Sequence, residues 1–410
     1  MSNFTSLLMT LPLTLTADSL PGAEPPVLRT FLSQPSFVLT TPQVELAVTQ
    51  LGGHMAPVTF LRDTAHPVQP YHFTPWQEET PEDLPAPVLV PLRGDFFCLP
   101  FGGNGEPVAG EAHPPHGEIA GAPWTFAGTR TTGDVTTLTL VFDTTVRKGR
   151  VTKELSLVAG QNAVYSRHLI EGMAGRMPLG HHATLSLPDE PGSVRIATSP
   201  IRFGMTCAGV FSDPAKGEYQ ALQPGRKWTD LTRVPSAWKD APDSDLTRLP
   251  VNPGFADLVQ VVNEPWAKTG GPAWVTATVA SRGYLWFALK DPAVLRSTVF
   301  WLENRGRHGR PWNGRNNCLG LEDVTACFAD GLAASTRENP LTQEGVETSV
   351  TLHAHTPTAV NYIQGVAPVP AGFDVVKSVE FGPGEVTFIS AAGHRVTAPV
   401  RHEFLKTGAL

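Results

Sequence analysis

Hydrophobic and polar residues alternate over short stretches along most of the chain, which is the pattern of β-strands that bury one face. The alternation is clearest at residues 43–48 and 152–158. The same pattern predicts further strands at residues 135–144, 150–158, 163–171, 273–280, 283–289, 297–303, 346–352, 376–381 and 384–391. We therefore expect antiparallel sheets with one buried and one wetter face.

Two long stretches interrupt this pattern. Residues 63–91 are rich in Pro, His and Glu and include Trp76. An irregular segment of this length in a compact domain is usually functional or disordered, and the aromatic residues favour an ordered loop near a site. Residues 188–270 are rich in Pro and Asp and are predicted to be elaborated connections with few strands. The best helical candidate is at residues 324–334.

The composition favours one all-β domain. The 410 residues include 38 glycines and 39 prolines and only 17% are charged, which fits many short strands joined by turns. A chain of this length can form two domains or one large all-β domain. We predict a single domain over residues 1–410, in which residues 1–40 supply added strands.

Charge and hydropathy exclude several classes of partner. The net charge is −7 and the pI about 6.0, so no overall field attracts nucleic acid or an anionic membrane. No apolar run approaches the ~20 residues of a membrane span. Residues 1–17 are apolar, but the first basic residue is Arg29, so they lack the basic region of a signal peptide. We expect soluble structure in the cytoplasm, with export left open.

The four cysteines give no sign of a metal site or a disulfide framework. They are widely spread and form no C-x-x-C pair, so a zinc–cysteine site is not predicted. Free cysteine is a common small buried residue in chains of this length. A bridge between Cys318 and Cys327 stays open.

One carboxylate stands out for its position. Glu322 follows the apolar step Leu319-Gly320-Leu321, which in turn follows a polar loop that begins at Trp312. A carboxylate behind an apolar run is costly to bury, and desolvation raises its pKa, which suits a base near neutral pH. Taken alone, a surface glutamate at a strand end is the commoner reading.

Histidines cluster in two places. His113 and His116 lie in a Pro-rich loop, and His181 and His182 precede an apolar strand. Histidine is suited to giving and taking protons near neutral pH. A metal held by these histidines together with Glu322 is the competing interpretation, but no H-E-x-x-H or similar spacing is present. We predict no metal and no cofactor.

Aromatic and basic residues lie beside the same segments. Tryptophan faces suit the C–H face of a sugar ring, while convergent polar groups bind its hydroxyls. Core packing is the alternative for some of these tryptophans, and solvation is the alternative for the arginines. The residues are Trp76, Trp124, Trp301, Trp312, Arg305, Arg307, Arg310 and Arg315.

In its order of motifs the chain resembles the aldose 1-epimerase (galactose mutarotase) superfamily over roughly residues 40–400. The resemblance implies a large antiparallel β-supersandwich with few short helices. It implies that His116, in His116-Gly117, binds substrate, that His182 is the general acid and that Glu322 is the general base. These three would converge on one pocket. If the strand register differs by one residue, His181 would take the place of His182 as the general acid.

The chain also departs from the family pattern. The family's aromatic residue after the acid histidine is Leu185 here, and the family's early arginine motif has only Arg93 as its nearest counterpart. The predicted substrate-binding residues are His116, His181, Arg93, Trp124, Trp312 and Arg315.

The resemblance implies an aldose 1-epimerase-like enzyme that interconverts the anomers of a monosaccharide or a sugar derivative. It would work without a cofactor, as a monomer or a homodimer. The alternative is a non-catalytic carbohydrate-binding protein on the same fold. A glycoside hydrolase would usually need a second carboxylate, and the sequence supplies only one convincing candidate.

Overall fold

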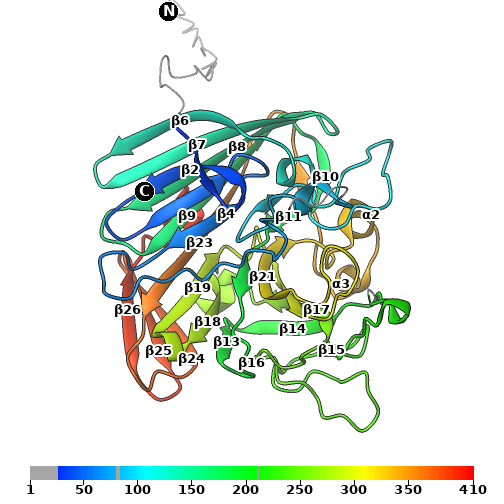
Figure 1. Ribbon diagram of the computed structural model, residues 1–410. Helices are drawn as coiled ribbons and strands as arrows, with labels where there is room; N and C mark the ends of the chain where they lie inside the picture. Colours follow the sequence, from blue (N-terminus) through cyan, green and yellow to red (C-terminus); the bar gives the residue numbers. More distant parts are fainter. Residues whose placement is uncertain (1–25, 80–83, 211) are drawn as a thin grey trace, which may run out of the picture.

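Two large antiparallel sheets dominate the computed structural model, which describes residues 26–79, 84–210 and 212–410 (Figure 1). The expectation for residues 1–17 falls outside the described residues. The nine-stranded sheet has the order β16-β13-β18-β19-β23-β9-β8-β7-β6. Its strands are β6 (Thr125–Thr132), β7 (Val135–Thr144), β8 (Gly149–Val158), β9 (Ala163–Glu171), β13 (Val194–Thr198), β16 (Arg248–Leu249), β18 (Ala273–Val279), β19 (Tyr284–Lys290) and β23 (Thr358–Pro368).

The eight-stranded sheet carries the candidate site. Its order is β15-β14-β17-β20-β21-β11-β5, and β12 also pairs with β21. Its strands are β5 (Phe97–Cys98), β11 (Leu179–His181), β12 (Thr184–Ser186), β14 (Ile201–Thr206), β15 (Lys227–Trp228), β17 (Ala256–Asn263), β20 (Ser297–Asn304) and β21 (Asn317–Thr325).

Smaller elements complete the domain. The remaining strands are β1 (Arg29–Phe31), β2 (Gln34–Thr40), β3 (Glu45–Thr49), β4 (Met55–Thr59), β10 (Gly175–Met177), β22 (Val350–Leu352), β24 (Val376–Gly382), β25 (Glu385–Ser390) and β26 (Arg395–Pro399). The short helices are α1 (Trp266–Thr269), α2 (Gly331–Thr336), α3 (Pro340–Gln343) and α4 (Phe404–Thr407), with 3₁₀ turns η1 (Pro87–Leu89), η2 (Glu118–Ala120), η3 (Pro214–Lys216) and η4 (Ala280–Arg282). None of the helices in these ranges is long and apolar enough to cross a membrane.

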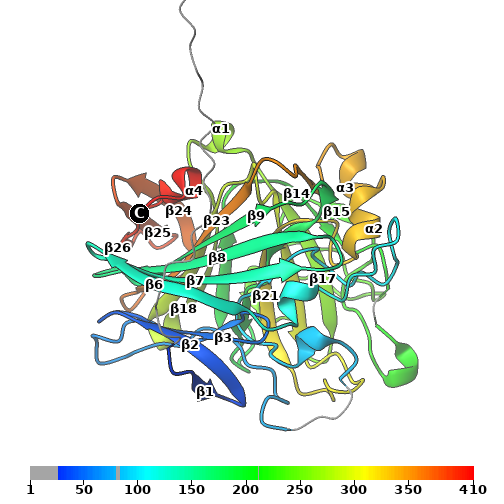
Figure 2. The same ribbon diagram turned by 90° about the horizontal axis from the view of Figure 1, so that it is seen from above.

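Strand alternation divides the apolar side chains between two cores. Trp286 and Leu321 belong to the large core, and Phe287, the neighbour of Trp286, packs instead on Phe388 in a second core. This second core lies between the nine-stranded sheet and the sheet β24-β25-β26, which Figure 2 shows beside β23 and α4. The nine-stranded sheet is therefore buried on both faces over part of its area.

The strand predictions largely hold, while two other predictions are wrong. Strands β7 and β9 have the predicted bounds, and β22 is shorter than predicted. Residues 324–334 are not one helix, because Val324 and Thr325 complete β21 and α2 begins only at Gly331. Gly331 has φ +83°, which breaks the chain direction there.

Residues 188–270 are not strand-poor. They supply β13 to β17, and β14 and β17 pair with each other inside the eight-stranded sheet. The apolar runs that form these two strands are short and lie between Pro- and Asp-rich loops, so the composition of the whole segment concealed them. These connections instead build one side of the sheet that carries the site.

Candidate active site

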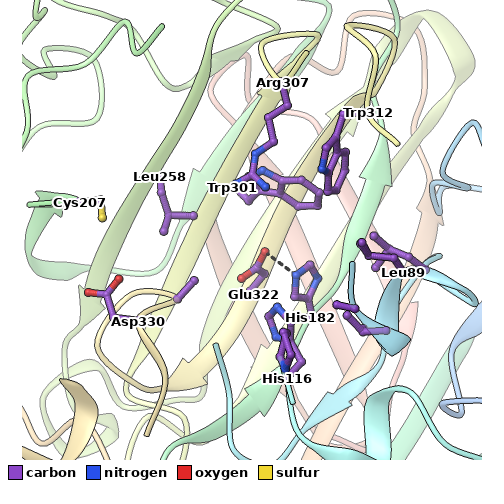
Figure 3. Close-up of a pocket in the computed structure, with 15 residues that line it drawn as sticks. Leu89, His116, His182, Cys207, Leu258, Trp301, Arg307, Trp312, Glu322 and Asp330 are labelled. Atoms are coloured by element: carbon purple, nitrogen blue, oxygen red, sulfur yellow. Dashed lines mark ion pairs between the residues drawn. The ribbon is translucent and has the colours of Figure 1, made fainter. Parts of the chain in front are cut away.

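Glu322 and His182 form the centre of the site. Val299 of β20 lies opposite Glu322, and Gly320 of β21 lies opposite Thr184 of β12, so His182 sits just before the strand that borders Glu322. His182 Nε2 is 3.2 Å from Glu322 Oε1, and both side chains are buried (Figure 3).

The Leu319-Gly320-Leu321 step explains why the carboxylate fits there. Leu319 and Leu321 are fully buried in the main core, which turns Gly320 and Glu322 to the other face of the sheet. A Cβ on Gly320 would lie 2.5 Å from Glu322 Oε1 and 2.9 Å from the Cβ of Trp301. Only glycine leaves room for the carboxylate to reach His182.

His116 enters the site from a constrained turn. Its φ is +61°, and Gly117 follows with φ +82°, where a Cβ would lie 2.0 Å from the carbonyl oxygen of Leu99. The turn therefore packs tightly against the chain that follows β5. The His116 ring lies 4.9 Å from the His182 ring at 81°, and His116 Nδ1 is 3.3 Å from Cys98 Sγ.

A stack of rings holds His182 from behind. Phe96 stacks on His182 with ring centroids 4.6 Å apart, and His54 stacks on the other side of Phe96 at 4.0 Å. His182 Nδ1 is 3.2 Å from the Thr184 hydroxyl. Because a hydroxyl can donate or accept, Thr184 is compatible with a proton on either nitrogen of His182.

These residues open on a cavity of about 360 Å³. Tryptophans form one wall, with Trp312 edge-on to both Trp76 and Trp301, and the Arg307 guanidinium lies 5.2 Å from the Trp312 ring centroid. The rest of the wall is mainly aliphatic. The lining residues are Ala86, Val88, Leu89, Leu92, Pro115, His116, His182, Cys207, Leu258, Trp301, Arg307, Trp312, Glu322, Ala329 and Asp330 (Figure 3).

Burial sets the protonation of the central pair. It raises the pKa of Glu322 well above its ordinary 4.5, although the charge of Arg307 opposes the shift. Burial, together with the neighbouring His116, lowers the pKa of His182 well below 6.5. Both shifts disfavour the charged form of each group, so they act against an ion pair between Glu322 and His182.

Sequence reasoning assigned no role to Glu303, which shapes the cavity from β20. Glu303 accepts hydrogen bonds from the backbone N–H groups of Gly306 (3.0 Å) and Arg307 (3.1 Å). Burial raises its pKa to about 7, against the opposing effect of Arg307. It thus anchors the loop that carries Arg307 and Trp312. The available signal was a second glutamate at the end of an apolar strand, Trp301-Leu302-Glu303.

Four of the predicted substrate-binding residues lie away from the cavity. His181 faces the opposite side of the sheet, where its Nδ1 is 2.8 Å from Asp95 Oδ2. Arg93 is buried and donates to the carbonyl oxygens of residues 31 and 32. Trp124 lies under Lys153 and donates to a backbone carbonyl, and Arg315 pairs with Glu79. His116 and Trp312, by contrast, line the cavity.

His181 and His182 face opposite sides of the sheet, and only His182 lines the cavity. The His181 ring stacks on Tyr362 at 4.2 Å, inside the sandwich, while its neighbour His182 faces the cavity. The loop of residues 63–91 is near the site as expected, since Trp76 contacts Trp312 and η1 supplies Val88 and Leu89 to the wall.

The remaining predictions concern a metal site and a disulfide. Within the described ranges, no three His, Cys, Asp or Glu side chains are arranged to hold a metal ion together, and His113 lies 3.0 Å from Glu111 instead. Cys318 and Cys327 are both buried free thiols.

Among known proteins, the chain matches solved structures by their fold. No protein-family model and no curated protein matches the sequence. Solved structures do match over more than four-fifths of the chain, with TM-scores of 0.50 to 0.55, and several of them are described as aldose 1-epimerase or mutarotase relatives. Another match, at a TM-score of 0.51, is described as a TPR-domain containing protein from Parabacteroides distasonis. The chain has the galactose mutarotase-like fold.

Three structures illustrate this fold assignment. A candidate aldose 1-epimerase from Klebsiella pneumoniae has a TM-score of 0.55 at 12% identity, covering 83% of this chain and 82% of its own. A galactose mutarotase-like protein from Clostridium acetobutylicum has 0.53 at 12%, covering 83% and 98%. A galactose mutarotase related enzyme from Lactobacillus acidophilus has 0.50 at 10%, covering 82% and 99%.

These identities support the fold and leave the chemistry to the site itself. The galactose mutarotase-like fold predicted from the strand pattern and motif order is confirmed. Within this fold, the cavity lies against the eight-stranded sheet, on the face that carries Glu322.

Proposed function

We propose that the protein opens and recloses the ring of a sugar hemiacetal and so interconverts its anomers. The observation that supports the proposal is the convergence of His116, His182 and Glu322 on one cavity. Ring opening needs a base for the anomeric hydroxyl and an acid for the ring oxygen. One carboxylate and one imidazole in contact, sharing a proton, provide both.

The proton balance is simple. In the reactive form His182 holds the shared proton, and the Glu322 carboxylate takes the proton from the anomeric hydroxyl. His182 gives its proton to the ring oxygen while the bond between C1 and the ring oxygen breaks, leaving the open-chain aldehyde. Rotation about the C1–C2 bond and the reverse transfers reclose the ring on the other face. No cofactor and no net proton are needed.

His116 has a separate role in this proposal. Burial lowers the pKa of His116 to about 4 and raises that of Cys98, so both are neutral near pH 7. When the Cys98 thiol donates to Nδ1, the ring proton of His116 is on Nε2. That N–H can then donate to a substrate oxygen on which negative charge develops.

The decisive experiment measures anomer exchange by NMR across a panel of aldoses and sugar derivatives. Each proton transfer contributes about 10²–10⁴-fold, so Glu322→Gln and His182→Asn should each lower kcat by at least about 100-fold. His113→Asn is the matched control, because His113 pairs with Glu111 and does not line the cavity. Equal rates in the wild type and both site variants would refute the catalytic assignment.

A non-catalytic sugar-binding protein is the second candidate. The feature in its favour is burial, which raises the pKa of Glu322, the proposed base, and lowers that of His182, the proposed acid, and so disfavours the charged form that each role needs. Binding alone would raise the melting temperature with sugar, since ligands that prefer the native state stabilise it. The absence of faster anomer exchange in the same samples would then favour this second function.

A further inference from the structure

Two aromatic side chains lie on the surface of the segment that follows β14. Trp238 is 47% exposed and Tyr219 is 41% exposed, and among the described residues they are the only exposed aromatic side chains. Their ring centroids are 5.8 Å apart at 63°. Phe255, which is half-buried, is edge-on to Trp238 with ring centroids 5.9 Å apart. We call Tyr219, Trp238 and Phe255 the aromatic platform.

The Trp238 ring is held in place although the residue is 47% exposed. Its indole N–H donates to the carbonyl oxygen of Gln220 at 2.8 Å, and its backbone N–H donates to the Ser236 hydroxyl at 3.2 Å. A tryptophan on a mobile loop would lose much rotamer freedom on binding a ligand. This ring has already lost that freedom, so an apolar surface can stack on it at little further entropic cost.

The platform is joined to the cavity loop by short contacts. The Glu218 carboxylate, next to Tyr219, accepts the backbone N–H groups of His308 (2.8 Å) and Gly309 (2.9 Å). On the other side, a Cβ on Gly306 would lie 2.1 Å from the backbone of Phe255, so these two segments touch. Arg307, between these contacts, lines the cavity. The residues beside the platform thus pack directly on the loop that carries Arg307.

We propose that the aromatic platform binds a second sugar unit, and that the substrate is the reducing end of an oligosaccharide. This inference rests on the proposed function for the cavity. The C–H face of a pyranose packs on a tryptophan face, and a further unit linked to the sugar in the cavity would lie over the loop of residues 305–316. A sugar that stacks on the Trp238 indole would explain why this residue is both fixed by hydrogen bonds and 47% exposed. A monosaccharide bound in the cavity alone would not explain this.

The test uses the full chain and isothermal titration calorimetry. The probes are glucose, maltose, maltotriose, cellobiose and cellotriose, with galactose and lactose as a second series. At least one di- or trisaccharide should bind about fivefold or more tightly than its monosaccharide. Trp238→Ala should remove that gain and leave the Kd of the monosaccharide unchanged. Trp266→Ala is the matched control, because Trp266 is in α1 under Lys406, away from the cavity loop (Figure 2).

Each result decides the question. If no oligosaccharide binds more tightly than its monosaccharide, or if the gain survives in Trp238→Ala, the platform is not a sugar subsite. The outcome is separable from the proposed activity, which depends on Glu322. If Trp238→Ala loses the tighter binding of oligosaccharides while Glu322→Gln retains anomer exchange, the subsite is supported and the proposed catalysis is refuted. If Trp238→Ala retains the tighter binding while Glu322→Gln loses anomer exchange, only the catalysis is supported.

Discussion

His54 supports the candidate site from behind and makes the stability of the protein depend on pH. Its side chain is fully buried, and its ring stacks on Phe96, which in turn stacks on His182. The backbone N–H of Arg93 points at Nδ1 at 3.4 Å, and Nε2 is 2.9 Å from the carbonyl oxygen of Ala120. A neutral ring with its proton on Nε2 satisfies both contacts. Burial lowers the pKa of His54 to about 3.

The direction and size of the effect follow from this shift. In the unfolded chain the imidazole has its ordinary pKa of 6.5, so below pH 6.5 the unfolded state binds more protons than the folded state. Stability is therefore present above pH 6.5 and is lost as the pH falls toward about 3. At about 1.4 kcal/mol per pH unit, His54 alone should cost about 2 kcal/mol between pH 7 and pH 5.

Other buried groups also titrate, so the assay compares differences between variants. Urea unfolding of the wild type and His54→Gln, followed by tryptophan fluorescence, gives the free energy of unfolding at pH 7 and pH 5. The variant should be the less stable protein at pH 7, because it loses the ring stack. Its disadvantage should shrink by about 2 kcal/mol at pH 5, since glutamine does not titrate.

A non-titrating core variant provides the control. Leu46 is fully buried in the main core, and Leu46→Ala should be destabilised by the same amount at both pH values. If the difference between wild type and His54→Gln changes no more between pH 7 and pH 5 than the difference for Leu46→Ala, the reasoning about His54 is refuted.

Three further predictions concern the site. Cys98→Ala should lower the rate of anomer exchange about 3- to 10-fold, because His116 Nδ1 loses its hydrogen-bond partner, whereas Cys98→Ser keeps a donor and should retain most activity. An equal loss of rate in both variants would contradict this. Between pH 5 and pH 8 the free energy of unfolding of Glu303→Gln, measured in urea, should rise by about 2–3 kcal/mol relative to that of the wild type. The reason is that a carboxyl whose pKa is raised from 4.5 to about 7 stabilises the fold less as the pH rises through this range; a difference that does not change with pH would exclude the shift. The acid limb of the exchange rate should lie well below pH 6.5, since burial lowers the pKa of His182; an NMR rate profile that falls around pH 6.5 would contradict this.

The strands could be predicted because they depend on local alternation, whereas His182 and Glu322 were selected by the resemblance to the epimerase family. A strand carries its side chains to alternate faces, so the buried leucines of the Leu319-Gly320-Leu321 step determine which way Glu322 points. The same rule separates His181 from His182, but the sequence alone did not show which of the two faced the cavity. That choice depended on the pairing of β11 and β12 with β21, which is a long-range contact.

The outer parts of the site depend on contacts that have no local pattern. Glu303 matters because it accepts two backbone N–H groups of a loop three and four residues later, and Arg315 lies outside the cavity because it pairs with Glu79, far away in the sequence. Arg93 looked suited to binding a substrate oxygen, yet its guanidinium is used by backbone carbonyls near Phe31. A charged residue next to a motif is thus a weak predictor of a ligand, since the fold can use its donors first.

The two adjacent carboxylates of β21 show how a structural acid differs from one able to transfer protons. Asp323 faces the interior, where Lys290 pairs with it at 2.5 Å and the Tyr362 hydroxyl donates at 2.8 Å. Its carboxylate oxygens are bound by donors that are themselves buried, and Asp323 does not line the cavity. Glu322, one residue earlier, contacts His182, has a raised pKa and lines the cavity. Contact with the cavity, rather than burial itself, is therefore what distinguishes Glu322 from Asp323 and supports the role proposed for Glu322.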